Sequence, residues 1–308
     1  MSAATFPALT ERLPSVRGKY EFDAPLARHT WFKAGGPAAV LYTPEDEEDL
    51  ASFLRRLPRE VPLLCLGVGS NLLIRDGGFV GVVVRFGKKF ARIETRGEQV
   101  YAGAGAPDIA VAAAARDADL GGLEFLRGIP GTIGGAVRMN AGAYGREISD
   151  VLVEAQALDR AGNEHRFSRA DMGYSYRHSA LPEDLIFTGA TLEGTPDLKE
   201  NIERRMQEIA DAREESQPLR TRTGGSTFKN PEGHKAWQLI DDAGCRGLRV
   251  GGAHVSDKHC NFLINDENGT AADLEDLGEE VRRRVRKTSG VELEWEIRIV
   301  GTKAEDRA

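Results

Sequence analysis

Short runs of β-branched and apolar residues, separated by turn-forming residues, dominate the first two hundred positions of the chain. This pattern predicts strands over residues 38–42, 61–66, 80–86, 151–158, 164–167 and 185–192, and a further hairpin over 91–102. One helix is predicted to open at Thr43-Pro44-Glu45-Asp46, which offers a cap, a proline and an acidic first turn, and to end near residue 57. An alanine-rich stretch predicts a second helix over 109–118. This part of the chain is therefore predicted to be mixed α and β.

A long charged segment separates this part from the rest of the chain. Residues 197–216 are predicted to form a helix whose buried side carries Ile202, Met206 and Ile209 at helical spacing. Beyond it the pattern predicts a helix over 236–243, strands near Arg249 and Phe262, and a helix over 273–287 with an apolar face of Leu274, Leu277, Val281 and Val285. We therefore place a domain boundary just before the long helix, between residues 195 and 196.

The last apolar segment alternates strictly, which predicts one further strand over residues 291–299. One face of this strand carries Val291, Leu293, Trp295, Ile297 and Ile299, and the other carries Glu292, Glu294, Glu296 and Arg298. Most polar faces of this kind are merely solvated. Alternation places Glu296 off the apolar face, but it does not distinguish Glu296 from Glu292 or Glu294 as a candidate for proton chemistry.

The composition is that of a folded protein that binds small molecules. The 308 residues are 41% hydrophobic and 29% charged, which allows two or three buried cores. The net charge of -7 at pH 7 offers no electrostatic footprint for nucleic acid or an anionic membrane. No charged leader precedes an apolar core at the start, and no segment approaches the roughly 18 apolar residues that cross a bilayer. A cytoplasmic protein without membrane insertion is therefore expected.

Cysteine and histidine spacing predicts neither a disulfide framework nor a metal centre. Cys65, Cys245 and Cys260 are odd in number and widely separated, so reduced thiols are expected. The six histidines match no metal-ligand spacing. Only His259 is considered as a residue near a site.

Two glycine-rich stretches predict unusual backbone. Gly67-Val-Gly-Ser-Asn71 follows the strand 61–66, and its successive N–H groups could cradle a phosphate. It matches neither the dinucleotide fingerprint nor the P-loop, so a purely structural turn remains open. Residues 128–145 hold six glycines, and a second such surface suggests an extended ligand such as a diphosphate. Tight packing between domains explains these glycines equally well.

Two further segments carry candidate polar groups. Residues 223–231 bring together the hydroxyl of Ser226, the cation of Lys229 and the amide of Asn230, which could hold a phosphorylated substrate and donate a proton. The alternative is that these side chains only bond local backbone, and no G-x-S-x-G elbow indicates a hydrolase. Arg177, within the aromatic segment 174–179, could clamp a carboxylate or could be an ordinary surface arginine.

Five motifs taken in order resemble the UDP-N-acetylenolpyruvoylglucosamine reductase family, over residues 30 to 301. The motifs are Gly67-Val-Gly-Ser-Asn71, Ile129-Pro-Gly-Thr-Ile-Gly-Gly with Asn140-Ala-Gly-Ala-Tyr-Gly145, Tyr176-Arg177-x-Ser179, Gly225-Ser226-x-Phe228-Lys-Asn-Pro231 and Glu294-Trp-Glu296-Ile-Arg298. Five motifs in sequence are far more specific than any one of them.

The resemblance implies an α+β chain in which a two-lobed FAD-binding fold of the vanillyl-alcohol oxidase type precedes an α+β substrate-binding domain. The expected divisions are a tail over 1–18, lobes over 19–86 and 87–195, the substrate domain over 196–302, and a tail over 303–308. It also implies non-covalent FAD and NADPH as co-substrate. The expected reaction reduces UDP-N-acetylglucosamine enolpyruvate to UDP-N-acetylmuramate for peptidoglycan precursors, in a cytoplasmic monomer.

The same resemblance implies roles for individual residues. Arg177, Ser226 and Glu296 match the catalytic positions, and Tyr144, Lys229 and Asn230 match positions that hold the nucleotide-sugar. The expected FAD-binding residues are Gly67, Gly69, Ser70, Asn71, Gly128, Pro130, Gly131, Gly134, Gly135, Asn140 and Gly142. The short interval between Arg177 and Ser226 leaves little room for the tyrosine lid of some members, so the chain resembles the subclass without it.

Two other functions are considered. An FAD-linked oxidase of sugars or alcohols would use the same flavin fold but react with oxygen, and residues 226–231 argue against it. A non-catalytic sensor of nucleotide-sugars is the alternative outside enzymes, and bound flavin would make it improbable.

Overall fold

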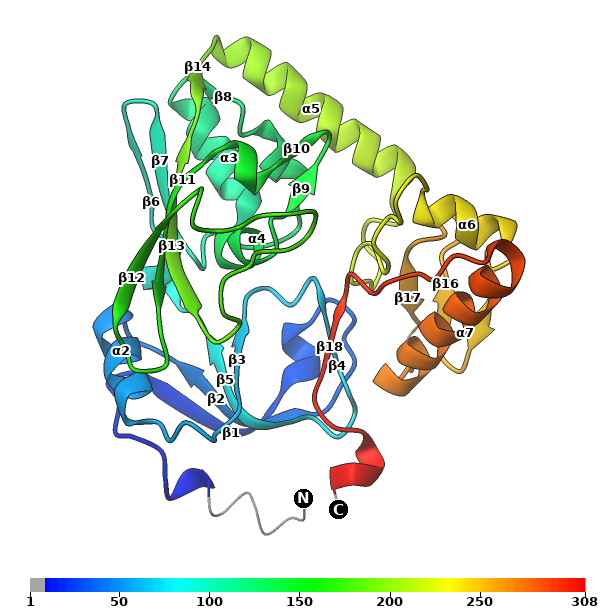
Figure 1. Ribbon diagram of the computed structural model, residues 1–308, viewed down its shortest axis with the longest axis horizontal. Helices are drawn as coiled ribbons and strands as arrows, with labels where there is room; N and C mark the ends of the chain where they lie inside the picture. The colour runs from blue at the N-terminus through cyan, green and yellow to red at the C-terminus, as the bar shows by residue number, and fades with distance from the viewer. Residues whose placement is uncertain (1–8, 267, 308) are drawn as a thin grey trace.

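The computed structural model describes residues 9–266 and 268–307, which form two lobes and a C-terminal unit (Figure 1). Residues 1–8 of the predicted tail 1–18, and residue 308 of the tail 303–308, lie outside the described residues. The lobes are stacked, and the long helix α5 (Lys199–Ser216) runs from the second lobe to the C-terminal unit (Figure 1). No helix in the part of the chain that the structure describes combines the length and apolar character needed to cross a membrane.

The first lobe is a four-stranded sheet covered by one helix. Its strand order is β1 (Lys19–Pro25), β2 (Pro37–Thr43), β5 (Phe79–Arg85) and β3 (Leu63–Leu66), with β1 antiparallel and the others parallel. Helix α2 (Glu47–Arg56) packs Leu50 and Phe53 on this sheet. The expected opening at residues 43–46 is wrong by one turn, because the Asp46 side chain caps the helix through the Asp49 N–H.

The second lobe is a five-stranded antiparallel sheet covered by two helices. The strand order is β12 (Glu164–Ser168), β11 (Leu152–Leu158), β13 (Ile186–Glu193), β7 (Gln99–Gly103) and β6 (Ile93–Arg96). The predicted helix 109–118 is confirmed as α3 (Asp108–Asp117). Helix α4 (Ile133–Arg138) was not predicted, because glycines disfavour helix. Short pairs complete the lobe: β8 (Leu120–Gly121) with β14 (Thr195–Pro196), and β9 (Gly142–Ala143) with β10 (Arg146–Glu147).

The two lobes are fastened to one another beside α2. Gly162, in the hairpin between β11 and β12, has φ of +72°, and an added Cβ would lie 2.3 Å from the carbonyl oxygen of Ala51. The nearby guanidinium of Arg160 donates to the carbonyls of residues 58, 59 and 61 at 3.4, 3.3 and 3.0 Å. Thr188 adds a hydrogen bond of 2.8 Å to Glu47. These contacts fix the separation of the two glycine-rich stretches, one of which lies in each lobe.

The C-terminal unit is a small three-stranded sheet packed against one helix, with a second helix beside the first. Antiparallel strands β15 (Arg249–Val250), β16 (Ala253–Val255) and β17 (Leu263–Asn265) lie against α7 (Ala271–Ser289), with α6 (Ala236–Asp242) alongside. The predicted apolar face of the last helix is confirmed, since Leu274, Leu277, Val281 and Val285 are all buried. The helix begins two residues before the predicted start, because Thr270 and Asp273 form a capping box.

The last strand leaves the C-terminal unit and joins the first lobe. Only β18 (Arg298–Val300) is a strand, and it pairs in parallel with β4 (Leu72–Ile74). The predicted continuous strand 291–299 is therefore wrong: residues before 298 have no ladder, apart from a bridge between Phe228 and Trp295. The alternating pattern fixes which side chains face the core, but the strand can begin only where a partner strand is available.

Further contacts hold the C-terminal unit to the first lobe. The Asp76 carboxylate accepts the N–H groups of Ala271 and Ala272 at 3.0 and 2.9 Å, at the start of α7. Arg75 and Glu275 form a bidentate ion pair, in which Nε and Nη2 of Arg75 donate to the two carboxylate oxygens at 2.9 and 2.8 Å. Phe32 belongs to the core of the C-terminal unit although it precedes β2 in the chain. The position of the C-terminal unit is thus set by the first lobe.

The ring of Trp295 occupies the space that a side chain at Gly278 of α7 would need. An added Cβ would lie 2.0 Å from the Trp295 ring. An alanine in a helix interior is ordinarily about 1 kcal/mol more favourable than glycine. Here we expect Gly278→Ala to lower the free energy of unfolding by about 1–3 kcal/mol, because the ring must move. Chemical denaturation of both proteins measures the difference.

The matched control is the same substitution in a Trp295→Phe background, where the smaller ring leaves room. There Gly278→Ala is expected to be neutral or stabilising. Equal destabilisation in both backgrounds would contradict the contact as its cause.

Candidate active site

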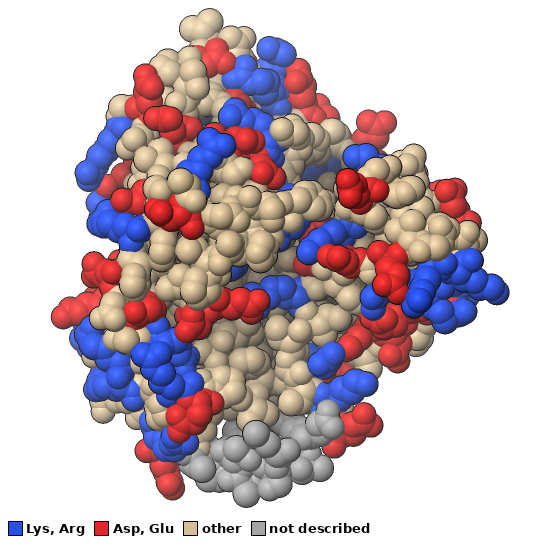
Figure 2. Space-filling view, in the orientation of Figure 1, with Lys and Arg blue, Asp and Glu red and all other residues tan. Residues whose placement is uncertain are grey.

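The three predicted catalytic residues come from different parts of the fold and gather where the lobes and the C-terminal unit meet. Arg177 lies on the loop between β12 and β13, Ser226 on a turn before α6, and Glu296 on the segment leading into β18. Charged side chains of both signs are interspersed over the face in Figure 2.

A tight turn presents Arg177. Ser175 and His178 exchange two backbone hydrogen bonds of 3.1 Å, and Arg177 has φ of +54° between them. A non-glycine residue in this region is strained, which is common at functional positions. The guanidinium lies 4.8 Å from the ring centre of Tyr176 and donates to the Gly142 carbonyl at 2.8 Å.

Arg177 and Glu296 form a largely buried pair. Nε of Arg177 donates to Oε1 of Glu296 at 3.1 Å, and their side chains are 16% and 14% exposed. Nη1 of Arg177 has no acceptor among the described residues. Sequence pattern left Glu292 and Glu294 as alternatives, but their side chains are 63% and 76% exposed and pair with surface cations. The structure therefore favours Glu296 as the carboxyl of the site.

Burial dominates the protonation of Glu296. It raises the pKa of this carboxyl, and the opposing effects of the Arg177 guanidinium and of Lys229 do not cancel the increase. The Glu296 carboxyl therefore retains its proton to a higher pH than an exposed glutamate does.

The turn that carries Ser226 is fixed on both sides. The Thr227 carbonyl accepts the Glu296 N–H at 2.8 Å, and the Thr227 N–H donates to the Asn261 carbonyl at 2.8 Å. Gly225, with φ of +78°, makes the turn. The partly exposed Ser226 hydroxyl has no hydrogen-bond partner among the residues that the structure describes. Local backbone bonding, the alternative considered for this serine, is thus not observed for its side chain.

The three predicted substrate-binding residues have different surroundings. Lys229 pairs with Glu294 at 3.3 Å and remains 32% exposed. Asn230 accepts the Ala236 N–H at 2.9 Å and so fixes the start of α6. Tyr144, with φ of +53°, lays its half-exposed ring 2.8 Å from the place of a Cβ on Gly128.

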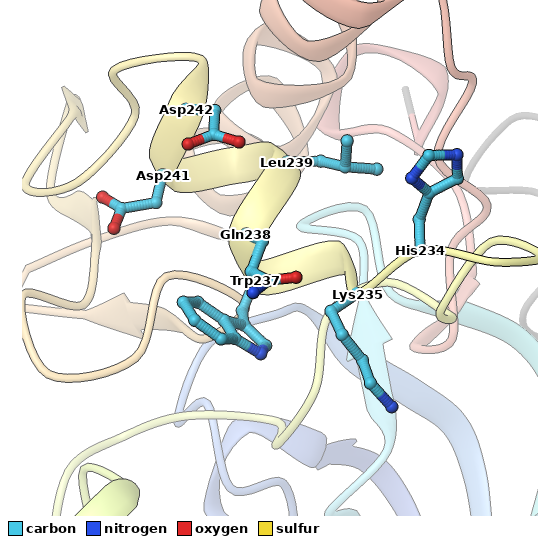
Figure 3. Close-up of a pocket in the computed structure, with 7 residues that line it drawn as sticks. All are labelled: His234, Lys235, Trp237, Gln238, Leu239, Asp241 and Asp242. Carbon is cyan, nitrogen blue, oxygen red and sulfur yellow. The ribbon is translucent and has the colours of Figure 1, made fainter.

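An open pocket of about 420 Å³ lies along α6, within the volume range of ligand sites. Figure 3 shows Lys235 and Trp237 extending to the same side of the helix. The indole of Trp237 is 39% exposed, and its ring centre is 6.4 Å from that of His259. Sequence reasoning singled out only His259 here. The signal it missed, an exposed tryptophan, is visible only in the structure. The lining residues are His234, Lys235, Trp237, Gln238, Leu239, Asp241 and Asp242.

Residues 67–71, here called the cradle loop, present unused backbone donors. None of their N–H groups donates to another of the described residues. Gly69 has φ of +66°, and an added Cβ would lie 2.3 Å from the His29 carbonyl, so only glycine fits. An added Cβ on Gly67 would lie 2.6 Å from Oγ1 of Thr132, which belongs to the second glycine-rich stretch. Converging free N–H groups of this kind bind anions.

The glycines of the second stretch fall into two groups. Those at 128, 131, 134 and 142 pack against protein, with the nearest atoms to an added Cβ at 2.8, 2.6, 2.9 and 2.7 Å. Gly135 and Gly145 have no atom within 4 Å of that position. The N–H groups of Gly135 and Thr132 have no acceptor in the described part of the chain. Packing thus explains the glycines at 128, 131, 134 and 142, and ligand binding stays a prediction for Gly135. Pro130 lies half-buried between them.

Asn140 is fully buried and connects this stretch to the Arg177 turn. Its amide donates to Glu147 at 2.8 Å and to the Ser175 carbonyl at 3.2 Å, and its oxygen accepts the Ser149 N–H at 2.9 Å. Both polar atoms of the Asn140 side chain are therefore committed within the protein.

Comparison with known proteins identifies the family. A family profile described as the C-terminal domain of UDP-N-acetylenolpyruvoylglucosamine reductase matches residues 217–300, and an FAD binding domain profile matches 37–168. The reductase of Parvibaculum lavamentivorans is 62% identical over 305 residues, which cover 99% of this chain and 98% of the relative. The chain belongs to the UDP-N-acetylenolpyruvoylglucosamine reductase family.

Other relatives agree over the whole length. The reductase of Azorhizobium caulinodans is 59% identical over 298 residues, covering 97% of each chain. The crystal structure of the Thermus caldophilus reductase superposes with a TM-score of 0.80 at 36% identity, covering 93% of this chain and all of the other. The resemblance inferred from five motifs is thus confirmed, and so is the two-part fold with an FAD-binding portion.

The residues present fit FAD. The free N–H groups of the cradle loop and of Thr132 suit a diphosphate, and the open side of Gly135 leaves room where any larger residue would intrude. These positions come from both lobes, as an elongated cofactor requires.

Paired glycine substitutions test this assignment. Gly135→Ala places a methyl group in open space, so we expect the thermal stability of the apoprotein to be unchanged and the Kd for FAD to rise about tenfold or more. Gly134→Ala is the matched control, because its methyl group would contact Ala104 and destabilise the apoprotein itself. Thermal unfolding and flavin fluorescence titration separate the two effects. Unchanged FAD affinity in Gly135→Ala would contradict this assignment.

Proposed function

We propose that this chain reduces UDP-N-acetylglucosamine enolpyruvate to UDP-N-acetylmuramate with bound FAD and NADPH, a step in peptidoglycan precursor synthesis. The observation that carries the proposal is the buried Arg177–Glu296 pair on the segment bound to the Ser226 turn. Among the described residues, the Ser226 hydroxyl and the N–H groups of the cradle loop have no hydrogen-bond partner. In this proposal residues 19–195 hold the flavin and residues 196–302 the nucleotide-sugar, in a cytoplasmic monomer.

The reaction adds one hydride and one proton across the enolpyruvyl double bond. When bound, FAD accepts a hydride from NADPH and supplies it to the terminal carbon of the substrate. Negative charge then spreads toward the substrate carboxylate, and a preorganised cation stabilises it. The unused Nη1 donors of Arg177 suit this role, since the Gly142 carbonyl and Glu296 already fix the guanidinium.

Glu296 and Ser226 complete the chemistry. A protonated Glu296 donates a hydrogen bond to the same developing charge, which burial of its carboxyl favours. Ser226 gives its proton to the carbon next to the carboxylate, and a relay from solvent restores it. Because the Thr227 carbonyl binds the Glu296 N–H, both groups move as one unit with the turn.

The nucleotide end is assigned to the face that carries α6. Lys229 and Asn230 lead into this helix, and its pocket offers the ammonium of Lys235 and the indole of Trp237. A cation and an aromatic face suit a diphosphate and a base. Tyr144, which belongs to the second lobe, packs its ring against Gly128.

Substitution of Ser226 tests the reaction directly. In Ser226→Ala we expect anaerobic flavin reduction by NADPH to stay within about twofold. Reoxidation by the enolpyruvyl sugar should fall by about 10²–10⁴, because only this step needs the proton. Stopped-flow absorbance of the flavin measures both rates.

Thr223→Val is the matched control, since Thr223 is a buried neighbour on the same loop. It is expected to leave both steps unchanged. If wild-type flavin is reoxidised by oxygen but not by the enolpyruvyl sugar, the chain is an oxidase instead.

The pKa of Glu296 predicts a pH dependence. A raised pKa means that the protonated form persists above the usual glutamate range and is lost as pH rises through the shifted value. We therefore expect the reoxidation rate to fall with rising pH, and this fall to vanish in Glu296→Gln. Glu292→Gln, on the exposed side of the same segment, should keep the wild-type profile. An identical pH profile in Glu296→Gln would assign the titration to another group.

A further inference from the structure

The side chain of Asn71, at the end of the cradle loop, contacts the segment of the C-terminal unit that carries Glu296. Its amide nitrogen donates to the Glu296 carbonyl at 3.0 Å and lies 3.7 Å from the sulfur of Met139 in the second lobe. Its backbone carbonyl accepts the Arg298 N–H at 3.1 Å. Asn71 therefore touches all three parts of the fold at one point.

These bonds hold the backbone of Glu296 from both sides. The Glu296 N–H is bound by the Thr227 carbonyl at 2.8 Å, and the Glu296 carbonyl by the amide of Asn71. The side chain leaves the backbone between these two anchors. The position of its carboxyl, 3.1 Å from Nε of Arg177, is thus set partly by Asn71.

The geometry does not suit the Asn71 side chain as a ligand of a diphosphate. An amide nitrogen offers two hydrogens, and here the Glu296 carbonyl and the Met139 sulfur take both directions. What remains is the amide oxygen, an acceptor, which an anion does not favour. The backbone N–H of Asn71, in contrast, has no acceptor among the residues that the structure describes and can donate to an anion.

We infer that Asn71 is a positioning residue: its side chain holds the Glu296 carboxyl against Arg177, and only its backbone faces the cofactor. The inference rests on the proposed function and adds a residue to it. One short loop then performs two tasks, because its backbone forms the cradle while its last side chain aligns the group that stabilises charge on the substrate.

Substitution of Asn71 separates positioning from cofactor binding. In Asn71→Ala we expect the Kd for FAD and the rate of flavin reduction by NADPH to stay within about twofold. Reoxidation by the enolpyruvyl sugar at saturating FAD should fall about tenfold to a hundredfold, because small displacements of catalytic groups carry costs of this size. The pH at which the reoxidation rate falls should also shift, because the surroundings of the Glu296 carboxyl change.

A double substitution tests whether Asn71 acts through Glu296. In a Glu296→Ala background, which removes the carboxyl that Asn71 is inferred to hold, Asn71→Ala should add less than about twofold to the loss of reoxidation rate. Asn71→Ser keeps a shorter donor and provides a second variant if Asn71→Ala folds poorly; it should lose less activity. Gly135→Ala, in the second glycine-rich stretch, should instead raise the Kd for FAD.

Three outcomes are distinguishable. Failure of wild-type protein to transfer hydride to the enolpyruvyl sugar would overturn the proposed function itself. A raised Kd for FAD in both Asn71 variants, with normal reoxidation once FAD is saturating, would make the side chain a cofactor ligand and overturn the inference. Fully independent losses in the double variant would also overturn it.

Discussion

The site depends on one backbone crossing, in which the chain leaves the C-terminal unit at Glu296 and pairs with the first lobe through β18 and β4. Without this pairing, the segment before it would be a solvated strand end and Glu296 an ordinary surface glutamate. The crossing places the carboxyl between a turn of its own unit and a loop of the second lobe. Burial there brings it against Arg177 and raises its pKa.

Rigidity around this crossing comes from polar contacts as much as from apolar cores. Asp76 caps α7, Arg75 pairs with Glu275, and Arg160 binds a row of carbonyls between the lobes. Each contact joins residues far apart in sequence at a boundary between two parts of the fold. The two glycine-rich stretches are therefore held at a fixed separation, which a cofactor bound across both lobes requires. Glycine serves there in two ways, as a spacer between packed backbones and as open space for a ligand.

Much of the fold could be predicted from periodicity, because most strands and helices bury one regular face. The edge strand β1 was not predicted, because most of its residues are exposed. Helix α4 was not predicted, because Gly134 and Gly135 disfavour helix. Contacts with residues 104 and 106 fix the first turn of α4, and local propensity cannot reveal them. The residue types of the site came from motif resemblance. The choice of Glu296 over its neighbours needed a partner 119 positions away.

The free energy lost when an ion pair is desolvated usually exceeds the attraction gained between its charges. The buried pair of Arg177 and Glu296 therefore needs a reason other than stability. In the proposed reaction the substrate brings its own carboxylate to Arg177. The attraction that lowers the Glu296 pKa is then shared with a second anion, while the desolvation that raises it remains. Glu296 is thereby driven toward its protonated form when substrate arrives, which is when a hydrogen-bond donor is needed. Substrate binding thus converts the ion pair into a neutral carboxylic acid, Glu296, beside a cation, Arg177, whose charge then acts on the substrate.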